Sequence, residues 1–217
     1  MQGATSLTRI CLIRHGETPW NAERRIQGQI DIGLNELGLR QADAAGRSLR
    51  EAGITALYGS DLKRAWTTAE RIGRLIGLDP QPLPELRERR YGLFEGLTYQ
   101  DARRDQPEMY AAFERRDPDY AFPGGGESLI QLAARITRRL EALAQDHAGQ
   151  NIAIVTHGGV LDIINRFVRG NPLHLPRDFL IPNAGMNWLR VEQGNWHIDS
   201  WGDTRHLEDG ALDELPG

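Results

Sequence analysis

Two histidines occupy matching positions in the sequence, each directly after a short apolar run. "LIRHG" at residues 12–16 places Arg14 and His15 after one run, and "VTHGG" at residues 155–159 places His157 after another. Imidazole can act as a nucleophile or as a hydrogen-bond donor, depending on which ring nitrogen holds the proton. One histidine near a strand end is often only a partly buried side chain. Two in matching positions, each followed by glycine, predict a shared site.

A histidine that attacks phosphorus and forms a phosphohistidine needs three kinds of help. Its ring must be neutral, with one nitrogen bare and the other N–H held by a neighbour. Fixed positive groups must surround the phosphoryl group, and a proton donor must serve the leaving oxygen. Lys63 is the only lysine among the 26 basic residues. Genomic base composition explains most of this excess of arginine, but arginine also suits planar, multi-oxygen anions such as phosphate.

Other phosphate and hydrolase motifs are missing from the sequence. No G-x-x-x-x-G-K-[ST] or G-x-S-x-G pattern occurs, and the glycines of "PGGGES" at residues 123–128 do not follow a predicted strand. No H-E-x-x-H pattern or other histidine and carboxylate cluster suggests a metal site, and Cys11 is the only cysteine. We therefore expect no metal cofactor.

The elements that must position the two histidines alternate along the chain. Strands are predicted at residues 9–14, 54–60 and 151–156, and helices at 35–53, 62–77, 128–147 and 158–170, with Ser60 or Asp61 capping the second helix. Residues 78–86 form at best an edge strand, and 184–192 with 195–201 form a hairpin. This order predicts an α/β fold of three α/β/α layers: a mostly parallel sheet, helices on both faces and an antiparallel edge hairpin. Ligands of such sheets bind outside the carboxyl ends of the strands, where both histidines would lie.

The length of 217 residues suits a single domain spanning residues 1–217. Between about residues 87 and 127 the pattern loosens into turns, aromatic residues and charges, with one or two short helices expected. Segments of this length in a compact domain are usually lids or binding loops, so we expect a lid-like excursion there.

The bulk composition argues against several partners and locations. The net charge of -4 does not favour nucleic acid or an acidic membrane surface. No apolar run approaches the roughly 20 residues of a membrane span, and the first residues lack the pattern of a signal peptide. One cysteine within an apolar run fits a reducing compartment, so we expect a cytoplasmic protein.

Five motifs occur in the order found in the histidine phosphatase superfamily: "RHGETPWN", "SDLKRAWTTAE", "ELRERRYGLFEG", "PGGGES" and "VTHGG". The sequence resembles this group, which contains cofactor-dependent phosphoglycerate mutases and many phosphatases, over essentially its whole length. It is especially similar to the bacterial branch labelled probable phosphoglycerate mutase. The resemblance implies a phosphoglycerate mutase-like fold.

The resemblance also implies residue roles. His15 would be the phosphorylated nucleophile, Arg14 and Arg64 would clamp the phosphoryl oxygens, and His157 would donate a hydrogen bond to them. Glu88 would be the proton donor and later the base that activates water. The residues implied to bind substrate are Asn21, Gln27, Gly28, Arg89, Tyr91 and Gly158.

Three functions fit these residues. The first is a phosphatase of small phosphorylated metabolites. The second is a phosphoglycerate mutase that needs 2,3-bisphosphoglycerate as primer, and the third is a non-catalytic binder of phosphorylated ligands. The third is disfavoured because every implied catalytic position is filled. The short segment between Glu88 and "GES" favours the phosphatase, because established mutases carry a longer insertion there. Four arginines, Arg89, Arg90, Arg115 and Arg116, form either a carboxylate site or a solvated basic face. The oligomeric state is left open.

Overall fold

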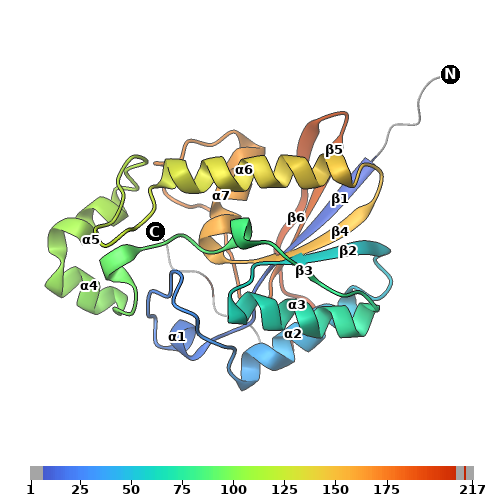
Figure 1. Cartoon of the computed structure of the whole chain (residues 1–217), viewed down its shortest axis with the longest axis horizontal. Helices are drawn as coiled ribbons and strands as arrows, with labels where there is room; N and C mark the ends of the chain where they lie inside the picture. Colours follow the sequence, from blue (N-terminus) through green and yellow to red (C-terminus); the bar gives the residue numbers. More distant parts are fainter. Residues whose placement is uncertain (1–6, 209–212, 214–217) are drawn as a thin grey trace.

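One mixed sheet of six strands forms the centre of the molecule (Figure 1). The computed structural model describes residues 7–208 and residue 213. The strand order is β3-β2-β4-β1-β5-β6. Its strands are β1 (Leu7–Arg14), β2 (Ile54–Gly59), β3 (Gln81–Pro82), β4 (Asn151–Thr156), β5 (Met186–Glu192) and β6 (Asn195–Asp203). Neighbours from β3 to β1 are parallel, whereas β5 and β6 join antiparallel, which confirms the predicted sheet with its edge hairpin.

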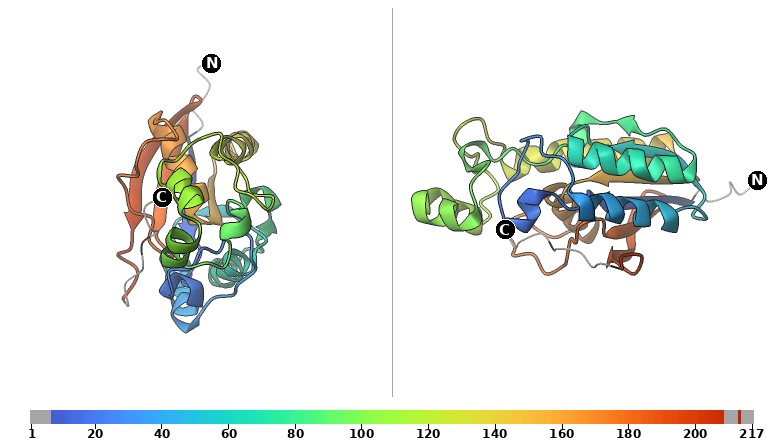
Figure 2. Two further views of the ribbon diagram at one scale, coloured as in Figure 1. Left: turned by 90° about the vertical axis from the view of Figure 1, so that its left-hand side faces the viewer. Right: turned by 90° about the horizontal axis from the view of Figure 1, so that it is seen from below.

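Helices cover both faces of this sheet (Figures 1 and 2). Helices α2 (Glu36–Ser48) and α3 (Lys63–Ile76) pack on Cys11 and Ile13 of β1, and α6 (Leu129–Asp146) and α7 (Gly158–Arg169) pack on Ile10 and Leu12. Successive residues of a strand point to opposite faces. Both faces of β1 and β4 are therefore buried, which explains why these strands are continuous apolar runs.

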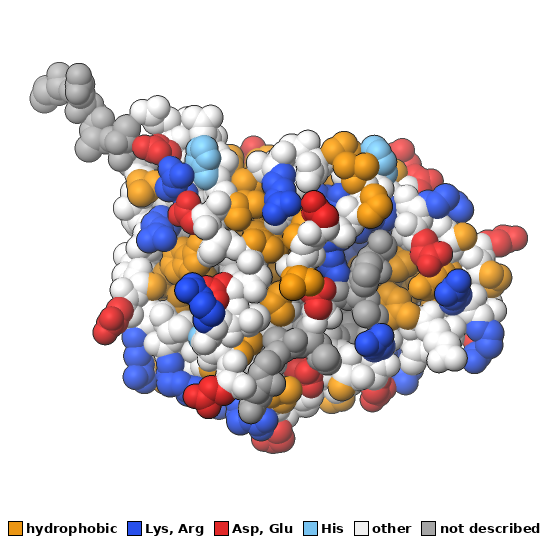
Figure 3. Space-filling view, turned by 180° about the vertical axis from the view of Figure 1, so that it is seen from behind, with side chains coloured by type: hydrophobic (Ala, Val, Ile, Leu, Met, Phe, Trp, Pro, Cys, Tyr) orange, Lys and Arg blue, Asp and Glu red, His pale blue; other side chains and the backbone are white. Residues whose placement is uncertain are grey.

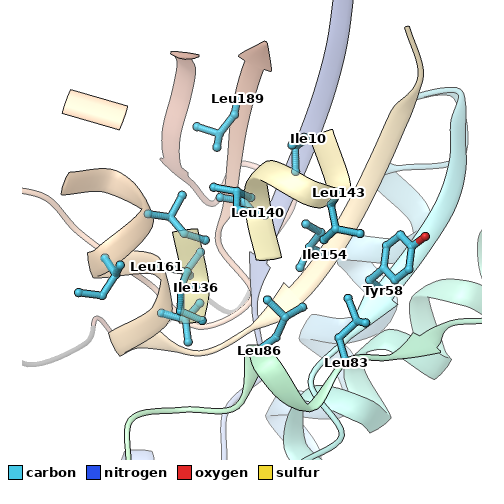
Figure 4. Close-up of a cluster of buried hydrophobic side chains, with 14 of the residues drawn as sticks. Ile10, Tyr58, Leu83, Leu86, Ile136, Leu140, Leu143, Ile154, Leu161 and Leu189 are labelled. Atoms are coloured by element: carbon cyan, nitrogen blue, oxygen red, sulfur yellow. The ribbon is translucent and has the colours of Figure 1, made fainter. Parts of the chain in front are cut away.

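The larger core lies between α6, α7 and the sheet. Figure 4 shows Ile136 and Leu140 of α6 and Leu161 of α7 directed toward Ile10 and Ile154 of the central strands. The helical spacing of the apolar residues of α6 in the sequence matches this buried stripe.

The predicted helix ends are mostly confirmed. Ser128 begins α6 with a capping box to Gln131, and Gly77 and Gly170 end α3 and α7 in the left-handed conformation. Helix α2 is shorter than predicted, since it ends at Ser48 and not near Gly53.

The predicted cap of α3 is wrong. Leu62 is its N-cap, and the side chain of Leu62 makes no capping hydrogen bond to the helix. Ser60 bonds instead to His157, and both carboxylate oxygens of Asp61 accept from Arg87. The Asp31 carboxylate, from a distant loop, accepts the Lys63 N–H at 2.6 Å, so a tertiary contact replaces the local cap.

The excursion at residues 87–127 forms a separate apolar cluster together with Ile26 and projects beyond the sheet, at the left of Figure 1. It contains the 3-10 turn η2 (Gly92–Phe94) and the short helices α4 (Tyr99–Asp105) and α5 (Pro107–Glu114). A second 3-10 turn, η1 (Pro84–Leu86), precedes it. Backbone bonds between Ile26 and residues 96 and 97 tie the excursion to the loop after β1. That loop also holds α1 (Pro19–Ala22), which was not predicted.

The outer surface mixes charges of both signs. Figure 3 shows acidic and basic side chains interspersed over the back of the molecule, with hydrophobic side chains between them. The described side chains of that face form no basic stripe of the kind that follows a nucleic-acid backbone. Within residues 7–208, no helix combines the length and apolarity that a bilayer crossing demands.

Candidate active site

The sheet brings the two histidines together. Strands β1 and β4 are parallel and in register, with Arg14 opposite Thr156, so His15 and His157 follow at the same edge. The His15 N–H donates to the Thr156 carbonyl at 2.9 Å. The two imidazole rings lie with their centroids 5.2 Å apart. The predicted convergence of the two strand ends is therefore confirmed.

The geometry of His15 sets its protonation. Nδ1 lies 2.8 Å from the Gly16 carbonyl oxygen, and because a carbonyl can only accept, Nδ1 carries the proton. Nε2 then holds a lone pair. Burial, reinforced by the positive charges of Arg64 and Arg14, lowers the pKa of His15 well below 6.5. The side chain is therefore a neutral imidazole with its proton on Nδ1 and a lone pair on Nε2.

Gly16 is required by packing. A β-carbon on Gly16 would lie 2.4 Å from the carbonyl oxygen of Gly38 in α2. Helix α2 therefore packs directly on the backbone that follows His15.

Two buried arginines lie beside His15. Arg14 donates from Nη1 to the Ile181 carbonyl at 2.7 Å, and Arg64 donates from Nη2 to the Gly28 carbonyl at 2.7 Å. Both acceptors are backbone carbonyl oxygens, which orient the two guanidinium groups. Both side chains line one cavity with His15, as expected of an anion clamp.

Glu88 lies between the excursion and the N-terminus of α7. Its Oε1 accepts the Arg89 N–H at 2.6 Å, and its Oε2 accepts the Gly159 N–H at 2.9 Å. A β-carbon on Gly159 would lie 2.3 Å from Oε1, so only glycine leaves room for this carboxylate. Glu88 lines the same cavity as His15. This role of Gly159 was not predicted, although Gly159 is the second glycine of the "THGG" motif.

His157 is fully buried and contacts a residue that the sequence analysis took for a helix cap. Its Nε2 lies 2.7 Å from the Ser60 hydroxyl oxygen. Burial, with Arg64 as the next contribution, lowers the pKa of His157 well below 6.5, so this ring is neutral as well.

The remaining predicted residues divide between two neighbouring cavities. Asn21, Gln27, Gly28 and Tyr91 line the cavity that holds His15, which confirms that these positions converge. Arg89 and Gly158 line the second cavity, and Tyr91 lines both. The two cavities are therefore neighbours that share Tyr91 and Tyr99 in their linings.

Two residues beside these cavities were not predicted. Asn183, in the loop before β5, donates from its side chain to the His15 carbonyl at 3.1 Å and so helps to fix the backbone of His15. Asp213 lines the first cavity and accepts the Ile181 N–H. Residues 209–212 and 214–217 lie outside the described residues.

The four arginines of the excursion separate into two pairs. Arg89 and Arg116 are buried and line the second cavity, whereas Arg90 and Arg115 are exposed. Arg89 donates to the Glu127 carbonyl at 2.8 Å. Arg116 pairs with Asp162, which also accepts from Arg166 at 3.0 Å. The solvated-face alternative therefore describes Arg90 and Arg115, whereas a carboxylate site at Arg89 and Arg116 stays a prediction.

Metal ligands do not gather in the described part of the chain. No group of three or more histidine, cysteine, aspartate or glutamate side chains there is arranged to hold a metal ion.

Comparison with known proteins agrees with this geometry. Residues 10–204 match the profile of the "Histidine phosphatase superfamily (branch 1)". The chain belongs to this superfamily. It is 43% identical to a metal-independent phosphoserine phosphatase of Arabidopsis thaliana, covering 94% of this chain and 84% of the relative. It is 34% identical to the probable phosphoglycerate mutase GpmB of Yersinia pestis, covering 96% of this chain and 99% of the relative.

A solved structure shares the arrangement of elements. The mycobacterial glucosyl-3-phosphoglycerate phosphatase in complex with VO3 is 31% identical, with a TM-score of 0.80 over 93% of this chain and all of that chain (100%). The recognised family and its fold are thus confirmed. The plant relative has a higher identity than the bacterial branch to which the motifs pointed.

Proposed function

We propose that this histidine phosphatase hydrolyses small phosphorylated metabolites through a phosphohistidine formed on His15. One observation carries the proposal. The Gly16 carbonyl holds Nδ1–H of a neutral His15 and leaves Nε2 bare, in a cavity also lined by Arg14, Arg64 and Glu88. Nucleophile, positive clamp and carboxyl group are the three parts that phosphoryl transfer to histidine requires.

In the first half-reaction, Nε2 of His15 attacks phosphorus while the bond to the leaving oxygen breaks. Arg14, Arg64 and His157 stabilise the charge on the phosphoryl oxygens. Glu88 gives its proton to the leaving oxygen. Two backbone N–H groups hold Glu88 as a carboxylate in the free enzyme, and a bound phosphate dianion favours its protonated form, so substrate binding supplies the acid.

In the second half-reaction, a water molecule takes the place of the alcohol that formed when the leaving oxygen was protonated. Glu88, now a carboxylate, takes a proton from this water as it attacks phosphorus. The bond between phosphorus and Nε2 breaks, and inorganic phosphate and free His15 result. One carboxyl group thus serves both halves.

The second cavity favours a substrate whose leaving group is itself anionic. Arg89 and Arg116 are buried there, with the Asp162 carboxylate paired to Arg116, and Tyr91 and Tyr99 line both this cavity and the one that holds His15. Arginine forks suit carboxylates. Two relatives are named for phosphoserine and for glucosyl-3-phosphoglycerate, both of which carry a carboxylate. We place the substrate in this class of phosphorylated carboxylic acids.

The charge work needs no metal, since arginines and histidines surround the phosphoryl position. One relative is named as metal-independent. Full activity after exhaustive EDTA treatment is the expected result, and loss that Mg²⁺ or Zn²⁺ restores would contradict it. A cytoplasmic location and a single domain over residues 1–217 stay predictions.

Phosphoglycerate mutase activity is the second candidate function. The buried pair Arg89 and Arg116 could hold a phosphoglycerate carboxylate, and one relative is named a probable phosphoglycerate mutase. This activity would use the same residues, with 2,3-bisphosphoglycerate as primer. A non-catalytic binder is disfavoured because the nucleophile, clamp and carboxyl positions are all filled.

The test is a hydrolysis screen over a panel of phosphorylated metabolites with wild-type protein and His15→Ala. The wild type should release phosphate, most rapidly from phosphorylated carboxylic acids, and His15→Ala should be inactive. Rapid quench with a labelled substrate should trap acid-labile label on the wild type only. Wild-type-like hydrolysis by His15→Ala would overturn the mechanism.

A further inference from the structure

Ser60 connects the strand edge to the second histidine. It directly follows β2, is fully buried, and donates its backbone N–H to the Val155 carbonyl at 3.0 Å. This bond fixes Ser60 beside the end of β4. Its hydroxyl oxygen then lies 2.7 Å from Nε2 of His157, the normal length of a strong hydrogen bond.

The direction of this hydrogen bond follows from the other neighbour of the hydroxyl. The Leu62 N–H points at the Ser60 oxygen from 3.4 Å and can only donate. If Nε2 of His157 also donated, the Ser60 proton would have no acceptor among the described residues. An unsatisfied buried group costs about 1–3 kcal/mol. If the hydroxyl donates to Nε2, the hydroxyl and Nε2 are both satisfied and Nδ1 alone lacks a partner among the described residues, whereas the reverse direction leaves the Ser60 proton without an acceptor as well.

We propose that Ser60 is a positioning residue that holds His157 in the tautomer with its proton on Nδ1, so that this ring presents an N–H to the phosphoryl group. A neutral imidazole carries one proton on one of its two nitrogens, and the hydrogen bond from the Ser60 hydroxyl to Nε2 keeps that proton on Nδ1. Burial and Arg64 keep His157 neutral. Nδ1 is buried and has no hydrogen-bond partner in the described part of the chain, and its ring lies beside that of His15, which lines the first cavity.

Two neighbouring rings thereby present opposite groups. For His15, a carbonyl acceptor takes Nδ1–H and leaves Nε2 as a nucleophile. For His157, a hydroxyl donor satisfies Nε2 and leaves Nδ1–H as a donor. With their centroids 5.2 Å apart, the rings divide attack and charge stabilisation between them. The phosphoryl part of this inference rests on the proposed function, whereas the tautomer does not.

The first test is nitrogen-15 NMR of wild-type protein labelled in its histidines, without ligand, at pH 7.5. Comparison with His157→Asn assigns the signals. We expect a protonated, pyrrole-type Nδ1 and a bare, pyridine-type Nε2 for His157. A protonated Nε2 would overturn the proposal. This result needs no turnover, so it stands even if the proposed function fails.

The second test uses variants. Ser60→Ala should leave His157 in a mixture of tautomers and lower kcat roughly 10- to 100-fold, as loss of a partner behind a histidine ligand does, with a smaller change in KM. Ser60→Thr restores the hydroxyl and should recover both the tautomer and kcat. Thr156→Val is the matched control, because its buried hydroxyl bonds to the Leu86 carbonyl and not to His157.

Either of two outcomes would overturn the role of Ser60. One is wild-type kcat in Ser60→Ala. The other is a loss of kcat with the His157 tautomer unchanged, which would mean that Ser60 acts through packing alone. If Ser60→Ala does not fold, the wild-type spectrum decides.

Discussion

The N–H of Gly159 donates to Glu88 Oε2 at 2.9 Å, and the missing side chain of Gly159 leaves the space that Glu88 Oε1 occupies. The helix that follows His157 therefore also positions the carboxyl group of the site. Gly159, the second glycine after His157, leaves room for the Glu88 carboxylate, since a β-carbon on Gly159 would lie 2.3 Å from Glu88 Oε1.

Gly159→Ala should displace Glu88 and slow both half-reactions. The α7 helix itself should persist, because alanine favours helix more than glycine does. Rapid quench should show slower phosphorylation and slower dephosphorylation of His15, while the thermal midpoint stays near or above the wild-type value. Gly33→Ala is the matched control, since no atom lies within 4 Å of its β-carbon position. Normal rates in Gly159→Ala would show that Glu88 does not move the proton.

Arg64→Ala should remove transition-state stabilisation. Arg64 is buried, aimed by the Gly28 and Ile30 carbonyls, and lines the cavity of His15. By analogy with lost oxyanion donors, kcat/KM should fall about 100- to 1,000-fold, which corresponds to a loss of about 2.7–4 kcal/mol of transition-state stabilisation. Arg74→Ala on the same helix is the control, because Arg74 is exposed and should leave kcat/KM unchanged. Equal effects of the two changes would contradict the clamp.

Stability should fall as the solution becomes acidic. Burial lowers the pKa values of His15 and His157 well below 6.5, so these rings stay neutral in the folded protein. In the unfolded chain they take up protons below about pH 6.5, so the unfolded state then binds more protons and the free energy of unfolding decreases. The contribution is complete above that pH and is lost as pH falls, at about 1.4 kcal/mol per pH unit for each ring.

Urea unfolding between pH 7.5 and pH 5.5, without phosphate, measures this slope. His15→Gln with His157→Gln should flatten it. His174→Gln should not, because His174 is exposed. An unchanged slope in the double variant would mean that other groups carry the acid sensitivity.

The sequence was informative wherever burial imposes a pattern. Strands β1 and β4 are covered on both faces, so their apolar runs and the polar residues after them were visible, and parallel pairing implied that His15 and His157 meet. The family motifs supplied Glu88, which no local pattern singles out from 30 acidic residues.

What could not be predicted depends on contacts between distant segments. A serine before a helix looks like a cap, and only the approach of β4 to β2 shows that Ser60 bonds to His157. Asp31 caps α3 from another loop, and Asn183 reaches His15 across 168 positions of sequence. Helix α1 has only four residues, too few for a periodic pattern.

The acceptor of the phosphoryl group is the last prediction, and we expect it to be water. The segment between Glu88 and Gly126 holds two short helices, α4 and α5, and a 3-10 turn, and lacks the longer insertion of established mutases. A mutase must retain its bisphosphate and keep water from the phosphohistidine. With 3-phosphoglycerate, with or without 2,3-bisphosphoglycerate, the enzyme should release inorganic phosphate, or hydrolyse another phosphomonoester far better, and isomerise slowly or undetectably. Arg116→Ala should raise KM for phosphorylated carboxylic acids more than for p-nitrophenyl phosphate, because Arg116 lines the second cavity, where we propose that the carboxylate binds. Rapid formation of 2-phosphoglycerate without phosphate release would reverse the assignment to a mutase and leave the roles of His15, Arg64 and Glu88 in place.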